Sequence, residues 1–180
     1  MFSFLNGKSI IDNTATLGVP NYFSNFKLSD GSITNVQILD TAGSEKYRSL
    51  ASSYYRKADC CLLVYDITER NSFDEIKDYF NEQVQEQCKK KIPVILLGNK
   101  TDLEENRVVP SEEAAKFCLE NDYIFMETSC LKNTNVSDAF ETLIELTNIE
   151  AKKNKNKDKD KEKGVKIKKD INIEKKKCHC

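Results

Sequence analysis

Two unbroken apolar runs most strongly limit what this chain can fold into. The first covers residues 59–66 and the second covers residues 92–98. An uninterrupted run of this length is typical of a strand that is buried on both faces of a parallel sheet. Residues 71–87 lie between the two runs and have helical spacing, with an apolar face made by Phe73, Ile76, Phe80 and Val84. The order of strand, helix and strand predicts a β-α-β unit.

The segment before this unit predicts a β-hairpin. Residues 22–28 and 33–39 are predicted to form two strands, and residues 33–39 show the alternation of a half-buried strand. Ser29, Asp30 and Gly31 separate the two strands and suit a tight turn. Residues 49–57, which follow the hairpin, have a helical pattern.

The segment after the β-α-β unit continues the alternation of helices and strands. A helix is predicted to open at Ser111, with Ser111 as its N-cap and two glutamates in its first turn. Residues 122–128 predict the last strand. A closing helix follows, with one face lined by Val136, Phe140, Leu143, Ile144 and Thr147. We therefore expect an α/β fold with a doubly wound, mostly parallel sheet.

Length and charge divide the chain into a body and a tail. The 180 residues allow one domain with a sizeable core, and no apolar run approaches the length of a membrane span. Residues 151–180 contain 13 lysines and five acidic residues, a net charge of +8, whereas residues 1–150 carry −9. We expect a globular domain over residues 1–150 and a disordered basic tail over residues 151–180. Such a tail suits a solvated tether better than a nucleic-acid-binding segment, and its Cys-x-Cys ending makes an anionic membrane the better target.

The cysteines and the N-terminus indicate a cytosolic protein. Residues 1–5 are too short and lack the basic flank of a signal peptide. The seven cysteines are scattered, form no zinc-like set, and are expected to be reduced.

Residues 40–50 carry the first candidate site. Asp40 stands where an alternating strand ends, and small residues follow it at once. A carboxylate in this place can hold Mg²⁺ through water, and Gly43 lets a backbone N–H approach a phosphate oxygen. An ordinary turn explains the Asp-x-x-Gly pattern of residues 40–43 about as well.

Longer matches identify a family. Residues 40–50 resemble the switch II segment of the Ras superfamily, and residues 54–58 and 63–68 resemble segments of its Rab branch. Residues 99–102 and 127–130 resemble the loops with which that family reads guanine. The chain is therefore identified as similar to the Rab family of small GTPases, and its residues 178–180 resemble the family's prenylated tail.

The resemblance also concerns the beginning of the chain. Asn6-Gly7-Lys8-Ser9 carries only the end of a P-loop, G-x-x-x-x-G-K-[ST], and Phe2 stands at the position of its first glycine. Residues 4–8 instead resemble the end of the family's first helix. We therefore expect a P-loop NTPase G domain that is truncated at its N-terminus, without the first strand, the P-loop and most of the first helix.

The guanine-reading loops imply specific roles. A carboxylate accepts two parallel hydrogen bonds from guanine N1–H and the N2 amine, and adenine offers no such pair. By resemblance, Asp102 makes this contact. Asn99 braces the loop and contacts the base, and the Lys100 stem covers the base or the ribose. The backbone at Ser129 and Cys130 meets guanine O6, so the expected cofactor is GTP or GDP.

The switch segments imply the phosphate and metal contacts. Asp40 would hold Mg²⁺ through water and Thr16 would ligate it directly. Ser44 stands at the position of the family's glutamine that orients the attacking water, and a serine is too short for that task, so hydrolysis is expected to be slow. The resemblance adds Thr41, Ala42 and Gly43 to the nucleotide site, and Thr16, Leu17, Gly18 and Val19 to switch I.

The tail implies a membrane anchor. By resemblance, Cys178 and Cys180 would each carry a geranylgeranyl group. Membrane physics supports two groups, since two chains with a basic segment hold a membrane firmly and one does not. An exposed cysteine pair, or a partial metal site with His179, is the alternative. The resemblance predicts the Rab escort and prenylation machinery, GDP-dissociation inhibitor, exchange factors and effectors as partners. It places the protein on the cytosolic face of a membrane.

Three functions stay open at this point. The first is a guanine-nucleotide switch in vesicle traffic. The second is a lipidated Rab-like interaction protein that holds no nucleotide, and the third is the product of an incomplete gene model. GTPase activity itself is left open, because the P-loop pattern is incomplete and Ser44 replaces the glutamine.

Overall fold

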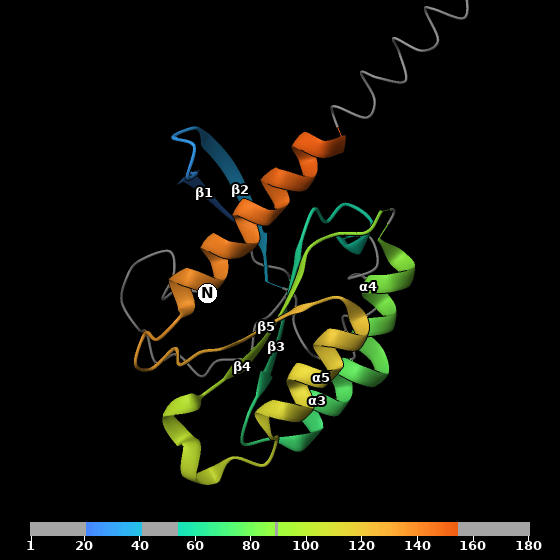
Figure 1. The fold of residues 1–180 in the computed structure, drawn as a ribbon, viewed down its shortest axis with the longest axis vertical. Coiled ribbons are helices and arrows are strands. Elements are labelled where there is room, and N and C mark those ends of the chain that lie inside the picture. Colours follow the sequence, from blue (N-terminus) through green and yellow to red (C-terminus); the bar gives the residue numbers. More distant parts are fainter. Residues whose placement is uncertain (1–20, 41–53, 89, 155–180) are drawn as a thin grey trace, which may run out of the picture. The chain divides into compact units, whose positions relative to one another are not determined.

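The computed structural model describes residues 21–40, 54–88 and 90–154 of the chain, and these form two separate sheets (Figure 1). The first sheet pairs β1 (Asn21–Lys27) with β2 (Ile33–Leu39) in antiparallel fashion. The second sheet is parallel, in the order β3-β4-β5, and consists of β3 (Cys61–Asp66), β4 (Val94–Asn99) and β5 (Ile124–Glu127).

The hairpin has the turn that its sequence predicts. Gly31 has a φ of 81°, which L side chains avoid, and its N–H donates to the Leu28 carbonyl at 2.9 Å. The Asp30 carboxylate accepts from the Ser32 N–H at 2.9 Å and from the Ser32 hydroxyl at 2.5 Å. In β2, exposed and half-buried residues alternate, which confirms the predicted period of two, although the apolar Ile33 lies on the exposed side at 71%. Residues 22–27 of β1 alternate in the same way.

The apolar runs predict strands that are buried on both faces, and among the described residues β4 confirms this whereas β3 does not. The first five residues of β4, Val94 to Gly98, are all buried. In β3, Leu63 and Tyr65 are buried while Val64 is 53% exposed. The fold class is therefore confirmed in its parallel part, and β3 and β4 each begin two residues later than the corresponding apolar run.

The predicted helix over residues 71–87 is continuous, but its middle turn is wider. It consists of α3 (Arg70–Glu75), the π-helical η2 (Ile76–Phe80) and α4 (Asn81–Gln87). The apolar face is confirmed, because Phe73, Ile76 and Val84 are buried. A spacing of three to four residues fits an α-helix with or without one wide turn, so the pattern did not reveal η2.

Helix α5 (Ser111–Asn121) begins where predicted, but Ser111 is not its N-cap. The cap position is Pro110, whose extended backbone (φ −62°, ψ 139°) leads into the helix without a side-chain hydrogen bond. The Ser111 hydroxyl instead donates to Glu127 Oε1 at 2.7 Å. The N-cap prediction was wrong because a partner distant in sequence takes the hydroxyl.

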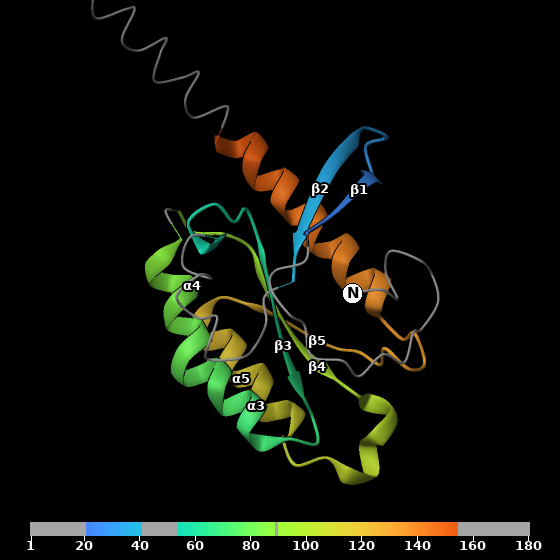
Figure 2. The same cartoon turned by 180° about the vertical axis from the view of Figure 1, so that it is seen from behind.

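Helices lie on both faces of the parallel sheet. Helices α3, α4 and α5 lie together on one face in both views (Figures 1 and 2). On the other face, Ala139 and Leu143 of the helix that begins at residue 136 pack against Ile95 and Leu97. This two-sided cover is the doubly wound arrangement that the sequence predicts.

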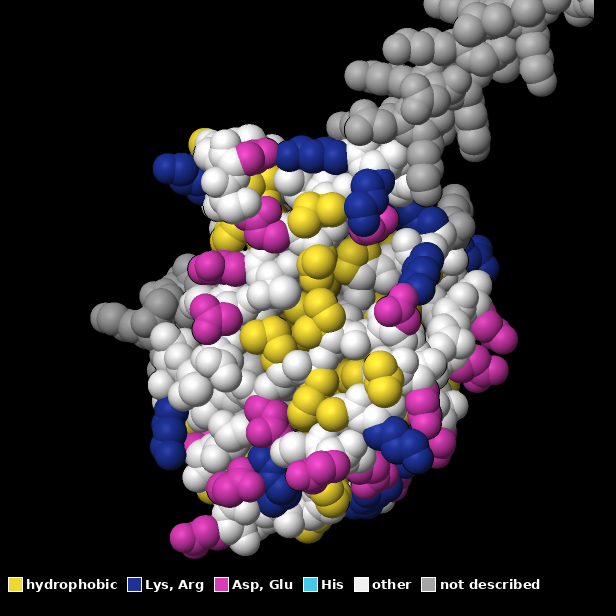
Figure 3. All heavy atoms as spheres, viewed as in Figure 1, with side chains coloured by type: hydrophobic (Ala, Val, Ile, Leu, Met, Phe, Trp, Pro, Cys, Tyr) yellow, Lys and Arg dark blue, Asp and Glu magenta, His cyan; other side chains and the backbone are white. Residues whose placement is uncertain are grey.

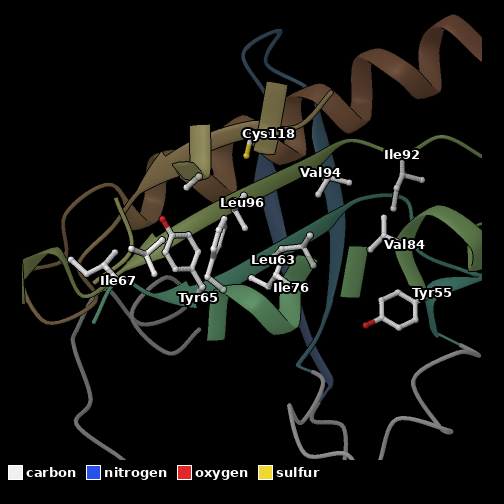
Figure 4. Packing of buried hydrophobic residues seen from close by; sticks show 13 residues of the cluster. Tyr55, Leu63, Tyr65, Ile67, Ile76, Val84, Ile92, Val94, Leu96 and Cys118 are labelled. Atoms are coloured by element: carbon white, nitrogen blue, oxygen red, sulfur yellow. The ribbon is translucent and has the colours of Figure 1, made fainter. Parts of the chain in front are cut away.

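The larger core lies between the sheet and α3, η2, α4 and α5 (Figure 4). Leu63, Leu96 and Ile76 meet at its centre, and each is at most 5% exposed. Tyr65 lies toward the carboxyl end of β3, where its ring centroid is 5.0 Å from that of Phe73. The core therefore fixes the strand ends from which the loops described below emerge.

On the face shown in Figure 3, apolar side chains gather down the middle, and charged side chains of both signs lie mainly around them. The described part of this face thus has no continuous basic area, in agreement with the acidic balance of residues 1–150. Among the described residues, every helix is too short or too polar to span a bilayer.

Tyr65 and Gly98 generate a stability prediction. They are directly opposite in the β3–β4 register, and a Cβ on Gly98 would lie 2.7 Å from the Tyr65 hydroxyl oxygen. That hydroxyl is buried and has no hydrogen-bond partner among the described residues. We expect Gly98→Ala to cost about 1–3 kcal/mol of unfolding free energy, and Tyr65→Phe to be neutral or stabilising by up to about 1 kcal/mol.

Urea unfolding of the wild type, both single variants and the double variant measures the coupling between the two positions. Because Tyr65→Phe removes the atom that an alanine at position 98 would meet first, the cost of Gly98→Ala should fall by about 1 kcal/mol in that background. An equal cost in both backgrounds would show that the close approach of the hydroxyl is not what excludes a side chain at Gly98.

Candidate functional site

The two loops that sequence analysis singled out leave neighbouring strands at the same sheet edge. Residues 99–102 follow β4 and residues 127–130 follow β5, and these strands pair in parallel with Gly98 opposite Glu127. The Thr128 N–H donates to the Gly98 carbonyl at 2.8 Å and extends the pairing by one residue. The carboxyl edge of an open α/β sheet is where such folds bind ligands.

Asn99 connects the two loops through its side chain. Its Oδ1 accepts from the Thr128 hydroxyl and from the Cys130 N–H, both at 3.3 Å. These bonds are at the long end of the usual range, so a better acceptor can take over the Cys130 N–H at small cost.

Lys100 has an unusual backbone conformation and an anchored side chain. Its φ of 72° and ψ of 36° lie in the left-handed region, which costs a residue with a Cβ about 1 kcal/mol. It is followed by the 3-10 helix η3 (Thr101–Asn106), whose first turn returns the Leu103 N–H to the Lys100 carbonyl at 2.9 Å. Lys100 Nζ lies 2.5 Å from Asp66 Oδ2 at the end of β3. The contact holds the long side chain along the sheet edge.

Asp102 is held by the opposite loop. The Ser129 hydroxyl donates to Asp102 Oδ1 at 2.5 Å, and it accepts from the Lys132 N–H at 3.0 Å. Ser129 is fully buried, whereas Asp102 is half-buried and therefore reachable from solvent. The hydroxyl fixes the orientation of the carboxylate, which can then accept two parallel hydrogen bonds from a planar ligand.

Asp66 is the most strongly engaged carboxylate of this edge. Burial works to raise the pKa of Asp66, but hydrogen bonds from Lys100 and Thr68 outweigh it and hold the pKa below its usual value. Thr68 donates its N–H at 2.8 Å and its hydroxyl at 2.7 Å to Asp66 Oδ1. The carboxylate is therefore charged at neutral pH and anchors Lys100.

Sequence reasoning did not assign roles to several residues of this edge. Thr101 donates its N–H and its hydroxyl to the Thr128 carbonyl, each at 3.2 Å, and so links the two loops a second time. Asp66 ends β3 directly opposite Asn99, and a parallel register for the two apolar runs would have placed it there. Thr101 and Thr128 lie within residues 99–102 and 127–130, which resemble the guanine-reading loops, but their contact with each other could be recognised only from the structure.

Of the residues predicted to contact the phosphates and the metal ion, the structure describes one, Asp40. Asp40 follows Leu39 at the end of β2 and is half-buried. Its carboxylate is the hard oxygen donor that Mg²⁺ prefers. Within residues 21–40, 54–88 and 90–154, no group of three or more ligating side chains could hold a metal ion. The other predicted residues lie outside these ranges: Thr16, Leu17, Gly18, Val19, Thr41, Ala42, Gly43, Ser44, Cys178 and Cys180.

Comparisons with known proteins match most of the chain. A sequence profile of the Ras family matches residues 1–149. The chain is 41% identical over 152 residues to the Ras-related protein Rab11D of Nicotiana tabacum, a match that covers 84% of this chain and 68% of that protein. It is 42% identical over 152 residues to the Ras-related protein RGP1 of Oryza sativa subsp. japonica, covering 84% of this chain and 66% of the relative.

A third relative agrees with these two. The Ras-related protein RABA4b of Arabidopsis thaliana is 41% identical over 152 residues, which are 84% of this chain and 67% of the relative. The chain thus spans about two thirds of the length of the relatives that it matches.

The anchoring of Lys100 by Asp66 predicts a dependence of stability on pH. A carboxylate whose pKa is lowered in the folded state stabilises the fold fully above its unfolded pKa, about 3.9, and loses this contribution as the pH falls through the folded value. Asp66→Asn should therefore cost about 2 kcal/mol at pH 7 and progressively less below about pH 4.

Thermal unfolding followed by circular dichroism between pH 7 and pH 3 measures this difference. Asp122→Asn is the matched control, because Asp122 also pairs with a lysine, Lys91, but its side chain is 80% exposed and should contribute little. A difference between Asp66→Asn and wild type that stays constant with pH would contradict the account.

Proposed function

This chain belongs to the Ras family, within its Rab-type small GTPases, and on that premise we propose that it is a guanine-nucleotide switch in membrane traffic. One observation carries the proposal: a carboxylate, Asp102, is oriented by the buried Ser129 at the carboxyl edge of the parallel sheet. The hydrogen bond joins two loops that are 27 residues apart in sequence.

The geometry suits guanine better than other bases. An oriented Asp102 carboxylate can accept from guanine N1–H and from the N2 amine at once, whereas adenine presents an acceptor at N1 and has no N2 amine. The Cys130 N–H, held only by a long bond to Asn99, is available to the acceptor at guanine O6. The Lys100 stem, which Asp66 anchors at one end, can cover the face of the base.

The phosphates and Mg²⁺ belong to the switch segments in this proposal. Asp40 at the end of β2 would hold the metal through water, and Thr16 would ligate it. Thr41, Ala42 and Gly43 would offer backbone to the phosphates. When bound, Mg²⁺ neutralises charge on the phosphate oxygens. Ser44 cannot reach an attacking water as a glutamine can, so hydrolysis is slow and the switch resets with the help of partners.

Membrane attachment completes the proposed switch. Cys178 and Cys180 would carry geranylgeranyl groups, and the lysines of residues 151–180 would add attraction to anionic lipid. Escort and prenylation proteins, GDP-dissociation inhibitor, exchange factors and effectors are the corresponding partners. The protein would act on the cytosolic face of a membrane.

The base specificity tests this proposal. Asp102→Asn replaces an acceptor by an amide that can donate, so it should weaken GDP binding at least about 100-fold and improve binding of xanthosine diphosphate, which has a carbonyl where guanine has its amine. Glu105→Gln, an exposed carboxylate on the same 3-10 helix η3, is the matched control and should change neither affinity.

Equilibrium titrations with fluorescent nucleotides and Mg²⁺ on the full chain provide the measurement. A wild type that binds GDP, with Asp102→Asn preferring the xanthine nucleotide, supports the proposal. A wild type that binds no guanine nucleotide would favour the other candidate, a lipidated Rab-like interaction protein that holds no nucleotide. Phe2, at the position of the first P-loop glycine, favours this candidate because the P-loop pattern is then incomplete.

A further inference from the structure

Arg107 connects the same two segments at a distance from the base-reading residues. It directly follows η3, and its side chain is 15% exposed. Its Nε and Nη2 donate to the two carboxylate oxygens of Glu104 at 2.7 and 2.6 Å. Its Nη1 donates to Glu127 Oε1 at 2.8 Å and to the Val109 carbonyl at 3.2 Å. One guanidinium thus joins η3, the following turn and the end of β5.

The two glutamates stand on the segments that carry the base-reading residues. Glu104 lies on η3 two residues after Asp102, and Glu127 is the last residue of β5, two residues before Ser129. The contact between Asp102 and Ser129 ties the segments together at the site itself. Arg107 adds a further link between the segments, near the start of α5, where Ser111 also donates to Glu127.

We propose that Arg107 is a positioning residue for base recognition, which holds η3 against the end of β5 so that the Asp102 carboxylate and the Ser129–Cys130 backbone stay at the spacing one guanine requires. This inference rests on the proposed function, because holding Glu104 and Glu127 together matters for base recognition only if the chain binds a guanine nucleotide. Arg107 itself touches no base in this scheme and acts only through Glu104 and Glu127.

The chemistry of arginine fits this task. Its planar fork can donate to two carboxylates and a carbonyl at fixed angles, which the single ammonium of a lysine cannot reproduce. Without Arg107, the carboxylates of Glu104 and Glu127 would lose the cation that they share. The Glu127 side chain, only 28% exposed, would keep the Ser111 hydroxyl as a donor. Repulsion would then open the spacing between η3 and β5.

The chain offers a matched control in Arg70. This arginine also bridges two carboxylates: it donates to Glu113 at 2.6 and 2.7 Å and to Asp74 at 3.1 Å. It joins α3 to α5 rather than the two base-reading loops, and its side chain is 41% exposed. If removing any arginine that bridges two carboxylates weakened nucleotide binding, Arg107→Ala and Arg70→Ala would both show the loss.

The first readout is discrimination between bases in the full chain. GDP and inosine diphosphate differ only in the N2 amine, which Asp102 is placed to read. Arg107→Ala should weaken GDP binding about tenfold or more and lower the GDP-to-IDP affinity ratio. Arg107→Lys, which keeps the charge and loses the fork, should give a smaller loss, and Arg70→Ala should leave the ratio unchanged.

The second readout needs no nucleotide. Amide hydrogen exchange of residues 101–102 and 128–132 should become about tenfold faster in Arg107→Ala, while exchange in β3 stays as in wild type and Arg70→Ala leaves both regions unchanged. Faster exchange throughout the sheet would assign Arg107 a general structural role and overturn the inference.

The two readouts separate the inference from the proposed function. If wild type binds neither GDP nor IDP, the proposed function fails, and hydrogen exchange alone decides whether Arg107 holds the loops together. If GDP binds but Arg107→Ala leaves the affinity ratio unchanged, the inference fails while the proposed function stands.

Discussion

The parallel pairing of β4 with β5 is the constraint on which the rest of the site depends. It places Gly98 opposite Glu127, so the chain leaves both strands at one edge and in one direction. This placement brings the polar groups of residues 99–102 and 128–130 close enough to bond to one another. Thr128, Asn99, Thr101 and Ser129 all bond across this gap.

This mutual bonding explains how the edge is kept ready for a ligand. Lys100 adopts a left-handed backbone conformation that a side chain disfavours, and it is stabilised by the turn of η3 and by the ion pair with Asp66. Ser129 orients Asp102 before any ligand arrives. A site whose donors and acceptors are already placed loses less free energy in ordering them on binding.

The sequence predicted the parts of this arrangement that depend on local patterns. The apolar runs predicted two strands of the parallel sheet, and Ser29-Asp30-Gly31 predicted the hairpin turn. Local patterns could not predict contacts between residues that are distant in sequence. The Ser111 hydroxyl donates to Glu127 instead of capping its helix, and Arg107, which follows η3, donates to Glu127 at the end of β5. The wide turn η2 escaped as well, because the apolar spacing is compatible with either helix geometry.

The central claim is that these two loops together read a guanine base. Isothermal titration of the full chain with GDP and with ADP, each with Mg²⁺, tests it most directly. The account predicts saturable binding of GDP with an affinity at least about 100-fold above that of ADP, since only guanine offers Asp102 a pair of donors. Equal affinities for the two nucleotides, or no binding of GDP by the folded protein, would contradict it.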